Sequence, residues 1–376
     1  MSRTSLKVWP LILVMALFAA ACDTNGDEAE APDDRDVATG DRDTEVARAD
    51  TGGGVLGDIQ SRGELRCGVN DAVPGFGIVE EGEYEGFDID FCRVVAAAVL
   101  GDAEAVEFVP LTAEARFTAL QAGEIDVLIR NTTWTASRDG GEGASFATTT
   151  FYDGQGMMVR ADSEFASLDD MDNAAICVLS GTTTELNLET EFSSRGLAYE
   201  PLTFEDNDTL REAFLAERCD GWTSDKSQLA GFRATWPEEE GGPEALTVFD
   251  ETMSKEPLGP AVRDGDDEWF DAVNWAVIAT IQAEEFGITS ENLADFENSE
   301  DPAIARLLGQ PDPEEGTTFD PGLGLDQDFA VNIIEQVGNY AEIYERHVGP
   351  DTPLGLERGE NALWTDGGLL YAPPYV

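Results

Sequence analysis

Two stretches that lie far apart in the chain repeat one pattern: a helix, a turn, and a strand that ends in a polar residue. ALQAGEIDVLIRN ends at Asn131 and AFLAERCDGWTSD ends at Asp225, and the two align without a gap. The alignment also sets Asp126 opposite Asp220. The identities are few, but a repeated unit of this kind predicts two similarly built α/β lobes.

Strands and helices alternate around each copy of the repeat. In the first copy we expect three apolar strands separated by two helices, and Gly101 and Gly123 end the helices. This βαβαβ order predicts a parallel sheet with helices on both faces, and the order restarts with the strand AAICVLS. The last third reads as helical, with helices expected at 268–287, 304–308 and 329–348.

The charge of the chain excludes several classes of function. It has 22 Lys and Arg against 77 Asp and Glu, a net charge of 22 − 77 = −55. Nucleic-acid binding and adhesion to anionic lipid both need a basic surface, so we expect neither. The simplest interpretation is a strongly hydrated surface, and our hypothesis is adaptation to a saline exterior, where salt screens the repulsion.

The N-terminus has the features of an export signal. Arg3 and Lys7 precede an apolar run that is short for a membrane span and ends in AAAC at Cys22. We predict a lipoprotein signal peptide at 1–21 and lipidation of Cys22; a plain secretory signal with an incidental cysteine is the alternative. Residues 22–54 are acidic and lack aromatic residues, which predicts a disordered tether before a folded body from Val55.

Four cysteines remain if Cys22 is lipidated, and an exported chain favours pairing them as disulfides. They are Cys67, Cys92, Cys177 and Cys219, which allow three connectivities. The sequence alone does not choose among them. If the two halves of the repeat are separate lobes, the pairs are Cys67–Cys92 and Cys177–Cys219. None has the CxxC spacing of a metal or redox site.

Signals for catalysis are weak. His347 is the one histidine, and we interpret it as a surface residue near the end of a helix rather than a catalyst. The chain has no GxxxxGK[ST] loop, no GxGxxG after a strand and no usual nucleophile motif around this histidine. We therefore expect no catalytic residues, no cofactor and no metal.

Signals for ligand binding are better, and they lie where strands end. In open α/β sheets, ligands bind at the carboxyl ends of strands, where Asn70, Asn131, Gly181 and Asp225 are expected. Arg138 follows one strand, and its planar fork suits a carboxylate. The segment SGTTTE follows another strand and offers N–H groups at a helix start. Together with Asp225 these groups fit a zwitterionic α-amino acid. The alternatives are that the threonines only cap a helix and that Arg138 pairs with surface acids.

Several longer motifs resemble one family. RNTTWTASRD, CVLSGTTTELNL, FYDGQGMMVR, SKEPLGPAVRDGDDEWFDAVNWA and IIEQVGNYAEIYERHVGP resemble, in order, the general L-amino-acid-binding proteins of bacterial ABC uptake systems, which belong to the polar amino-acid class of extracellular solute-binding proteins. The resemblance implies an α/β, two-lobe periplasmic-binding-protein clamshell (type II). Each lobe would be a mainly parallel sheet flanked by helices, and two strands would form the hinge. Lobe I would comprise 55–152 plus 258–376 and lobe II 153–257, which makes each proposed disulfide internal to a lobe.

The resemblance also implies which residues hold the ligand carboxylate. The family's α-carboxylate arginine falls on Arg138. Its carboxylate-binding backbone and hydroxyl groups fall on Thr133 in lobe I and on Thr182 and Thr183, beside Gly181, in lobe II.

The ammonium acceptors implied by the resemblance are the Asn131 carbonyl, the Thr133 hydroxyl and the Asp225 carboxylate. Many relatives have an acid where this chain has Asn70, which disfavours cationic side chains and fits broad specificity. We expect Phe76 and Trp134 to wall the pocket, with a core position as the alternative for Trp134.

We expect the remaining polar residues of that loop to be structural: Arg130 in an ion pair outside the pocket, and Thr132 and Thr135 in support of the loop.

The resemblance implies a monomeric, extracytoplasmic lipoprotein, periplasmic or on the cell surface, whose partners are an L-amino acid and the membrane subunits of an ABC permease. It would touch the membrane only through the lipid anchor. An amino-acid-sensing receptor component, or a clamshell enzyme such as a dehydratase, are the alternatives.

Overall fold

The computed structural model describes residues 54–376. The proposed signal peptide, Cys22 and nearly all of the proposed tether lie outside these residues.

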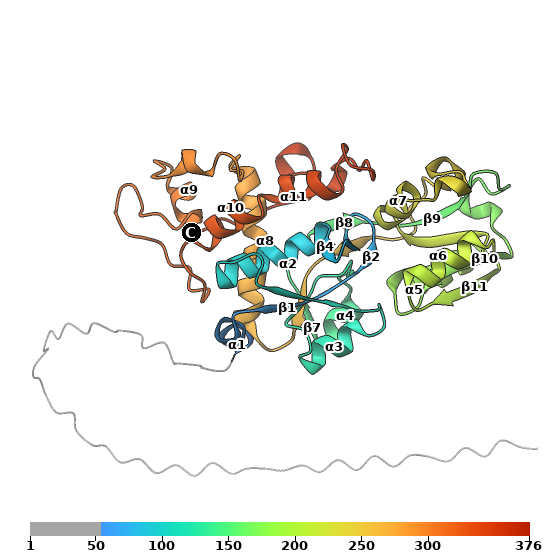
Figure 1. Cartoon of the computed structure of the whole chain (residues 1–376), viewed down its shortest axis with the longest axis horizontal. Helices are drawn as coiled ribbons and strands as arrows, with labels where there is room; N and C mark the ends of the chain where they lie inside the picture. Colours follow the sequence, from blue (N-terminus) through green and yellow to red (C-terminus); the bar gives the residue numbers. More distant parts are fainter. Residues whose placement is uncertain (1–53) are drawn as a thin grey trace, which may run out of the picture. The chain divides into compact units, whose positions relative to one another are not determined.

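The first lobe is built on a five-stranded sheet in the order β5–β1–β6–β15–β7. Strands β1 and β7 of this sheet are labelled in Figure 1. Its strands are β1 (Leu65–Val69), β5 (Val106–Pro110), β6 (Val127–Leu128), β7 (Ala144–Phe146) and β15 (Ala261–Arg263). Strand β1 runs parallel to β5 and β6, whereas β15 is antiparallel to β6 and β7. The sheet is therefore mixed, because β15, which comes from a distant part of the chain, lies between β6 and β7 and runs antiparallel to both.

The second lobe repeats this plan with the order β11–β10–β12–β9–β13. Its strands are β9 (Gln155–Arg160), β10 (Ala174–Leu179), β11 (Tyr199–Phe204), β12 (Gly221–Asp225) and β13 (Leu246–Val248). Strand β10 is parallel to β11 and β12, and β9 is antiparallel to β12 and β13. Two similarly built lobes are thus confirmed.

The internal repeat extends to individual hydrogen bonds. Asp126 donates its N–H to the Arg66 carbonyl at 2.8 Å, and its carboxylate accepts the Arg66 N–H at 2.8 Å. Asp220 makes the same pair of bonds to Ala175, at 2.7 and 2.8 Å. The two aspartates that the alignment matched therefore fasten equivalent strands, β1 and β10.

Two strands join the lobes. β8 (Phe151–Asp153) pairs antiparallel with β14 (Glu256–Leu258), and this pairing sets Glu256 opposite Asp153. The boundaries expected at 152/153 and 257/258 fall inside these strands. A separate antiparallel sheet, which sequence analysis missed, follows β1 and consists of β2 (Ala72–Val73), β3 (Gly77–Glu80) and β4 (Glu83–Glu85).

Helices cover both sheets. The first lobe has α1 (Val55–Arg62), α2 (Phe87–Leu100), α3 (Arg116–Ala122) and α4 (Ala136–Gly141); the second has α5 (Thr183–Arg195), α6 (Asn207–Leu215) and α7 (Lys226–Ala234). As expected, α2 and α3 end at Gly101 and Gly123, whose φ angles of 69° and 70° are left-handed.

The C-terminal third packs its helices on the first lobe. They are α8 (Asp267–Glu285), α9 (Pro302–Leu307), α10 (Phe329–Gln336) and α11 (Tyr340–His347), and α8 and α10 contact α2. The single helix expected at 329–348 is wrong: Gly338, with φ 108°, breaks it, and Asn339 starts α11 with a capping box. Short 3-10 helices complete the chain: η1 (Leu168–Asp170), η2 (Glu238–Glu240), η3 (Pro243–Ala245), η4 (Leu293–Phe296), η5 (Gly359–Asn361) and η6 (Trp364–Asp366).

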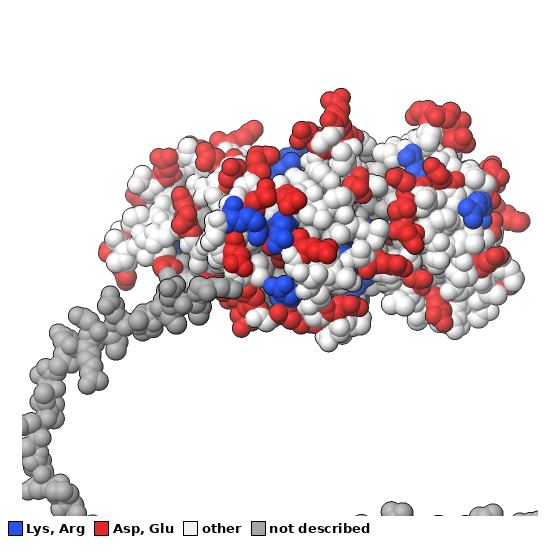
Figure 2. All heavy atoms as spheres, turned by 60° about the horizontal axis from the view of Figure 1, so that its bottom comes forward, with Lys and Arg blue, Asp and Glu red and all other residues white. Residues whose placement is uncertain are grey.

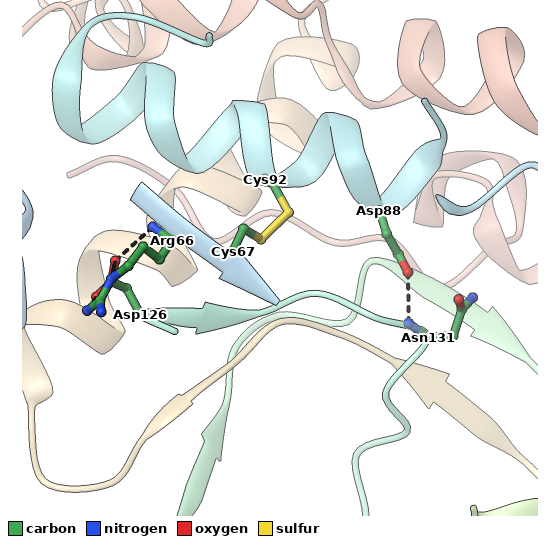
Figure 3. The surroundings of a disulfide bond; sticks show 6 residues. All are labelled: Arg66, Cys67, Asp88, Cys92, Asp126 and Asn131. Atoms are coloured by element: carbon green, nitrogen blue, oxygen red, sulfur yellow. Dashed lines mark hydrogen bonds and ion pairs between the residues drawn. A yellow bond between two sulfur atoms is a disulfide. The ribbon is translucent and has the colours of Figure 1, made fainter. Parts of the chain in front are cut away.

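The disulfides are the two within the lobes. Cys67 of β1 bonds Cys92 of α2, with Cα atoms 6.1 Å apart (Figure 3). Cys177 of β10 bonds Cys219, with Cα atoms 5.7 Å apart. Each bridge links a strand of its lobe's sheet, β1 or β10, to another segment of the same lobe, so the conditional pairing is confirmed.

On the face shown in Figure 2, acidic side chains are scattered over both lobes, with fewer basic ones between them. Within residues 54–376, no helix combines the length and apolar character needed to cross a membrane.

Candidate functional site

One pocket gathers polar residues from the carboxyl ends of strands in both lobes. It is lined by Asn70, Arg116, Arg130, Asn131, Thr133, Arg138, Leu179, Thr182, Thr183, Thr184, Asn207, Ser224, Asp225 and Gln228. Seven of the ten residues predicted to bind ligand are among them, which is the placement that parallel strands with polar ends favour.

The turn after β6 is held by buried side chains. Asn131 has φ 39°, a conformation that asparagine tolerates better than most residues. Its N–H donates to the Asp88 carboxylate at 2.7 Å (Figure 3), and its side-chain oxygen accepts from the Asn70 amide at 2.6 Å. Burial raises the pKa of Asp88 to about 7, although the Asn131 N–H and the Arg130 charge oppose the rise. These contacts fix the direction of the Asn131 carbonyl.

Arg138 lies on α4, directly after this turn. Its Nη1 donates to the Thr133 carbonyl at 2.9 Å, and its guanidinium lies over the Phe117 ring at 5.5 Å. Thr135 caps α4 by accepting the Arg138 N–H, and the Thr132 hydroxyl donates to the Arg130 carbonyl. The supporting roles expected of Thr132 and Thr135 are therefore confirmed.

The second lobe contributes the start of α5. Thr182 caps this helix by accepting the Glu185 N–H, and its hydroxyl donates to the Leu179 carbonyl at 2.7 Å. Gly181 has φ 71° and turns its carbonyl toward Arg116. Capping thus explains Thr182, and the N–H groups at the helix start make this edge suitable for an anion.

Glu256 of β14 is a functional candidate that sequence analysis missed. Its carboxylate accepts the hydroxyl protons of Thr133 at 2.6 Å and of Thr183 at 2.7 Å, so one side chain joins both lobes. It also accepts from Asn187 at 2.8 Å and from Ser254. A hydroxyl has one proton, so these two threonine oxygens have only lone pairs left for other partners. This modifies the expectation that their hydroxyls donate to a ligand carboxylate. The one feature of the sequence that could have indicated Glu256 is an acidic residue within a short, otherwise apolar strand.

Asp225 presents an unsatisfied acceptor. One carboxylate oxygen accepts from Gln228 at 2.6 Å, whereas Oδ1 is buried and has no hydrogen-bond partner within residues 54–376. Burial raises the pKa of Asp225 well above its usual range, and the charges of Asp153 and Glu256 raise it further. A donor group with positive charge would satisfy this oxygen.

Two arginines also line the pocket, contrary to expectation. We expected Arg130 in an ion pair outside the pocket, but its Nε donates to the Leu111 carbonyl at 2.6 Å and its side chain lines the pocket. Arg116 begins α3, and sequence analysis gave it no role. Arg130 begins the motif RNTTWTASRD, but that motif did not show that its side chain lines the pocket, and no motif or strand end marked Arg116.

Three other expectations are corrected. Phe76 does not wall the pocket, because it is fully buried in the core against Phe87 and Phe151. Trp134 is neither wall nor core: it is 45% exposed and stacks on Phe146. The His347 side chain is only 14% exposed and contacts Asp90 at 2.7 Å, so it is not a simple surface residue.

No cluster of three or more His, Cys, Asp or Glu side chains in the described part of the chain has an arrangement suited to a metal ion.

Comparison with known proteins agrees with this geometry. Residues 65–291 match the model of the bacterial extracellular solute-binding proteins, family 3. The chain is 49% identical over 320 residues to the general L-amino acid-binding periplasmic protein AapJ of Rhizobium johnstonii, covering 85% of this chain and 92% of the relative. It is 47% identical over 322 residues to the glutamate/glutamine/aspartate/asparagine-binding protein BztA of Rhodobacter capsulatus, covering 85% and 93%.

A solved structure shares the fold. The ABC transporter periplasmic binding protein of Brucella ovis, solved with glutathione bound, superposes with a TM-score of 0.81 at 45% identity, covering 86% of this chain and 99% of that one. Because the family model spans more than half of the sequence and the relatives match over nearly their whole length, the chain belongs to family 3 of the bacterial extracellular solute-binding proteins.

Proposed function

We propose that this protein is the solute-binding component of an ABC uptake system and that it captures L-amino acids between its lobes. The proposal rests on one observation: the same pocket holds a positive group that can bind an anion and a buried carboxylate oxygen that can accept from a cation. Arg138 presents a guanidinium there, while Asp225 presents a buried carboxylate oxygen without a donor. An α-amino acid supplies a carboxylate for the first and an ammonium for the second.

The ligand contacts follow from the hydrogen bonds already made. The carboxylate would lie between Arg138 and the start of α5, where free N–H groups and the guanidinium converge. The ammonium would donate to Asp225, to the Asn131 carbonyl and to the lone pairs of Thr133. Because the Thr133 proton is donated to Glu256, this oxygen is available as an acceptor.

Capture would proceed by a shift of population toward the closed form. Arg138 lies in one lobe, whereas α5 and Asp225 lie in the other, so only a closed arrangement satisfies both ends of the ligand. The ligand stabilises that arrangement by its differential affinity for it. The lobes would comprise 55–152 plus 258–376 and 153–257, with β8 and β14 as the hinge.

The proposal includes the partners and the location. A lipid on Cys22 would anchor a monomer outside the cytoplasmic membrane, and the closed form would dock on the permease subunits. The names of the relatives support amino-acid binding rather than catalysis. Mass spectrometry after incubation with an amino acid tests this: we expect the ligand to be recovered unchanged, and a new product would contradict the proposal.

A thermal-shift screen over the twenty L-amino acids tests ligand capture. A ligand in excess of its Kd raises stability by RT ln(1 + [L]/Kd), so at least one amino acid should raise the Tm while its deaminated analogue does so less. If none of the twenty raises the Tm, amino-acid capture is contradicted.

A further inference from the structure

Three guanidinium groups line the pocket, in a chain whose net charge is −55. They belong to Arg116, Arg130 and Arg138, and Asp225 is the one acidic residue in the lining, which gives 3 − 1 = +2 in formal charge. Buried charges are costly unless they are paired, so this excess calls for an explanation.

No acidic side chain among residues 54–376 forms an ion pair with these arginines. Their hydrogen bonds go to main-chain carbonyls: Arg116 to Gly181 at 3.3 Å, Arg130 to Leu111 and Arg138 to Thr133. Across residues 54–376, the ion pairs within 4.0 Å involve other basic residues. The donors of the three guanidiniums are therefore largely uncommitted.

Arg116 is the clearest case. It is 2% exposed. Within the described part of the chain, its Nε is buried without a partner, and its one hydrogen bond, to the Gly181 carbonyl, is long at 3.3 Å. Burial, together with the charges of Arg138 and Arg130, lowers the pKa of Arg116 well below its usual range, although the charges of Asp225 and Glu142 oppose the shift. Like charges therefore lie close together here, and those of Arg138 and Arg130 both disfavour the charged form of Arg116.

Arg130 is partly balanced. Burial, with the charge of Arg138, lowers the pKa of Arg130 to about 10, although the charges of Asp88 and Asp71 oppose the shift. The Asp88 carboxylate is itself occupied by the Asn131 N–H. Arg116 is therefore the guanidinium with the least compensation of its positive charge, and Arg130 lines the same pocket.

An ordinary α-amino acid does not meet this demand. Its single carboxylate takes Arg138 and its ammonium takes Asp225, so the ligand adds no net charge and leaves Arg116 and Arg130 as they are. A second carboxylate on the side chain would add the missing negative charge and accept the uncommitted N–H groups.

We propose that Arg116 and Arg130 form a subsite for a side-chain anion, so that the most tightly bound ligands are α-amino acids whose side chain carries a carboxylate. This rests on the proposed function, and it narrows the broad specificity that Asn70 led us to expect. The subsite lies on the first lobe, from which α3 supplies Arg116 and the segment after β6 supplies Arg130.

Calorimetric titration of the full chain with glutamate and glutamine tests the proposal, because these ligands have nearly the same shape and differ in charge. Aspartate and asparagine form a second such pair. We expect the acidic member of at least one pair to bind at least tenfold more tightly than its amide. Arg116→Met should weaken the acidic ligand at least tenfold and leave the amide within threefold, and Arg116→Lys should keep part of the preference.

Arg195→Gln is the matched control. It removes the same charge, but Arg195 lies on α5 in ion pairs with Glu191 and Asp169 outside the pocket. It should leave both affinities within twofold, which separates a local contact from a change in the overall field.

The outcomes distinguish this inference from the function on which it rests. Amino acids that bind to the parent protein without preference for the acidic member of either pair overturn the subsite and leave amino-acid capture intact. Equal losses for acid and amide in Arg116→Met also overturn it. If no α-amino acid binds, the proposed function itself fails. Should Arg116→Met not fold, Arg130→Met is measured in the same way. If neither variant folds, the proposal is decided by whether the parent protein binds the acidic ligand more tightly than its amide.

Discussion

At Asn131 the chain leaves a buried strand and enters the pocket, and one residue has to satisfy several constraints. It takes a left-handed conformation, its N–H is held by Asp88, and its side chain is held by Asn70. An ordered carbonyl at the ligand site therefore depends on a buried acid on α2, and the protonation of Asp88 matters to stability.

The raised pKa of Asp88 gives a pH dependence with a definite sign. An acid with a folded pKa of about 7 and an unfolded value near 3.8 binds more proton when folded between these values. Its contribution to stability is therefore present at low pH and is lost as the pH rises toward 7. Asp88→Asn stays neutral and keeps an acceptor for Asn131.

The free energy of unfolding of the parent should fall relative to Asp88→Asn by roughly 2–3 kcal/mol between pH 5 and pH 8. Urea denaturation at both values measures it, with Asp208→Asn on the exposed side of α6 as the control. A difference that does not change with pH would show that Asp88 does not titrate as described.

Asp225 is expected to act on the ligand ammonium. Asp225→Asn keeps the size and an oxygen for Gln228 but removes the charge. Calorimetry should show at least about tenfold weaker binding of an α-amino acid, and less than threefold change for the 2-hydroxy acid of the same skeleton, because only the former has an ammonium to lose. Equal losses for both ligands would exclude the ammonium role.

Among the elements, β14 has the most direct link to both lobes. Its Glu256 is 1% exposed and accepts four hydrogen bonds, from Thr133 of one lobe, from Thr183 and Asn187 of the other, and from Ser254. A carboxylate is acceptor-only, so it can serve all four donors at once.

Glu256→Gln should lower the free energy of unfolding by about 1–3 kcal/mol, because the new amide nitrogen would face donors that then lack an acceptor. Chemical denaturation measures this change, with Glu335→Gln at an exposed position of α10 as control. Unaltered stability would mean that the lobes do not depend on this carboxylate.

Elements with a local signal could be predicted from the sequence. The helices ending at Gly101 and Gly123 and the matched aspartates Asp126 and Asp220 came from spacing and repetition. The position of β15 between β6 and β7 could not be predicted from its own residues, because these partner strands lie more than a hundred positions earlier in the chain.

The same limit applies to the site. Asn70, Asn131 and Asp225 follow strands, so their position at the sheet edge was predictable. Only tertiary packing brings Arg116, at a helix start, into the pocket lining and brings Glu256, in the hinge, to the pocket threonines Thr133 and Thr183.

At the scale of the whole molecule, the chain carries a net charge of −55, and acidic side chains are more frequent than basic ones on the face shown in Figure 2. The pocket lining, in contrast, has three arginines and one aspartate. Like charges on the surface repel at low ionic strength, and salt screens this repulsion over about 10 Å at 0.1 M. The Tm should therefore rise between low and molar NaCl, as differential scanning calorimetry can measure. Glycerol at equal osmolality is the uncharged control. A Tm that does not rise in salt counts against the saline hypothesis.

The central claim is that the protein captures its ligand by closing two lobes around it and that the Arg138 guanidinium binds the ligand carboxylate. Arg138 contributes the charge on the first lobe, and α5 contributes N–H groups from the second. Removing the guanidinium would leave a desolvated ligand carboxylate without its charged partner, and such truncations cost about 2–5 kcal/mol.

The most direct test is therefore a calorimetric titration of the parent protein and of Arg138→Ala with the L-amino acid that raises the Tm most. We predict a loss of affinity of at least about thirtyfold, which corresponds to the lower end of that cost. Binding of the same amino acid to Arg138→Ala as tightly as to the parent would contradict the account.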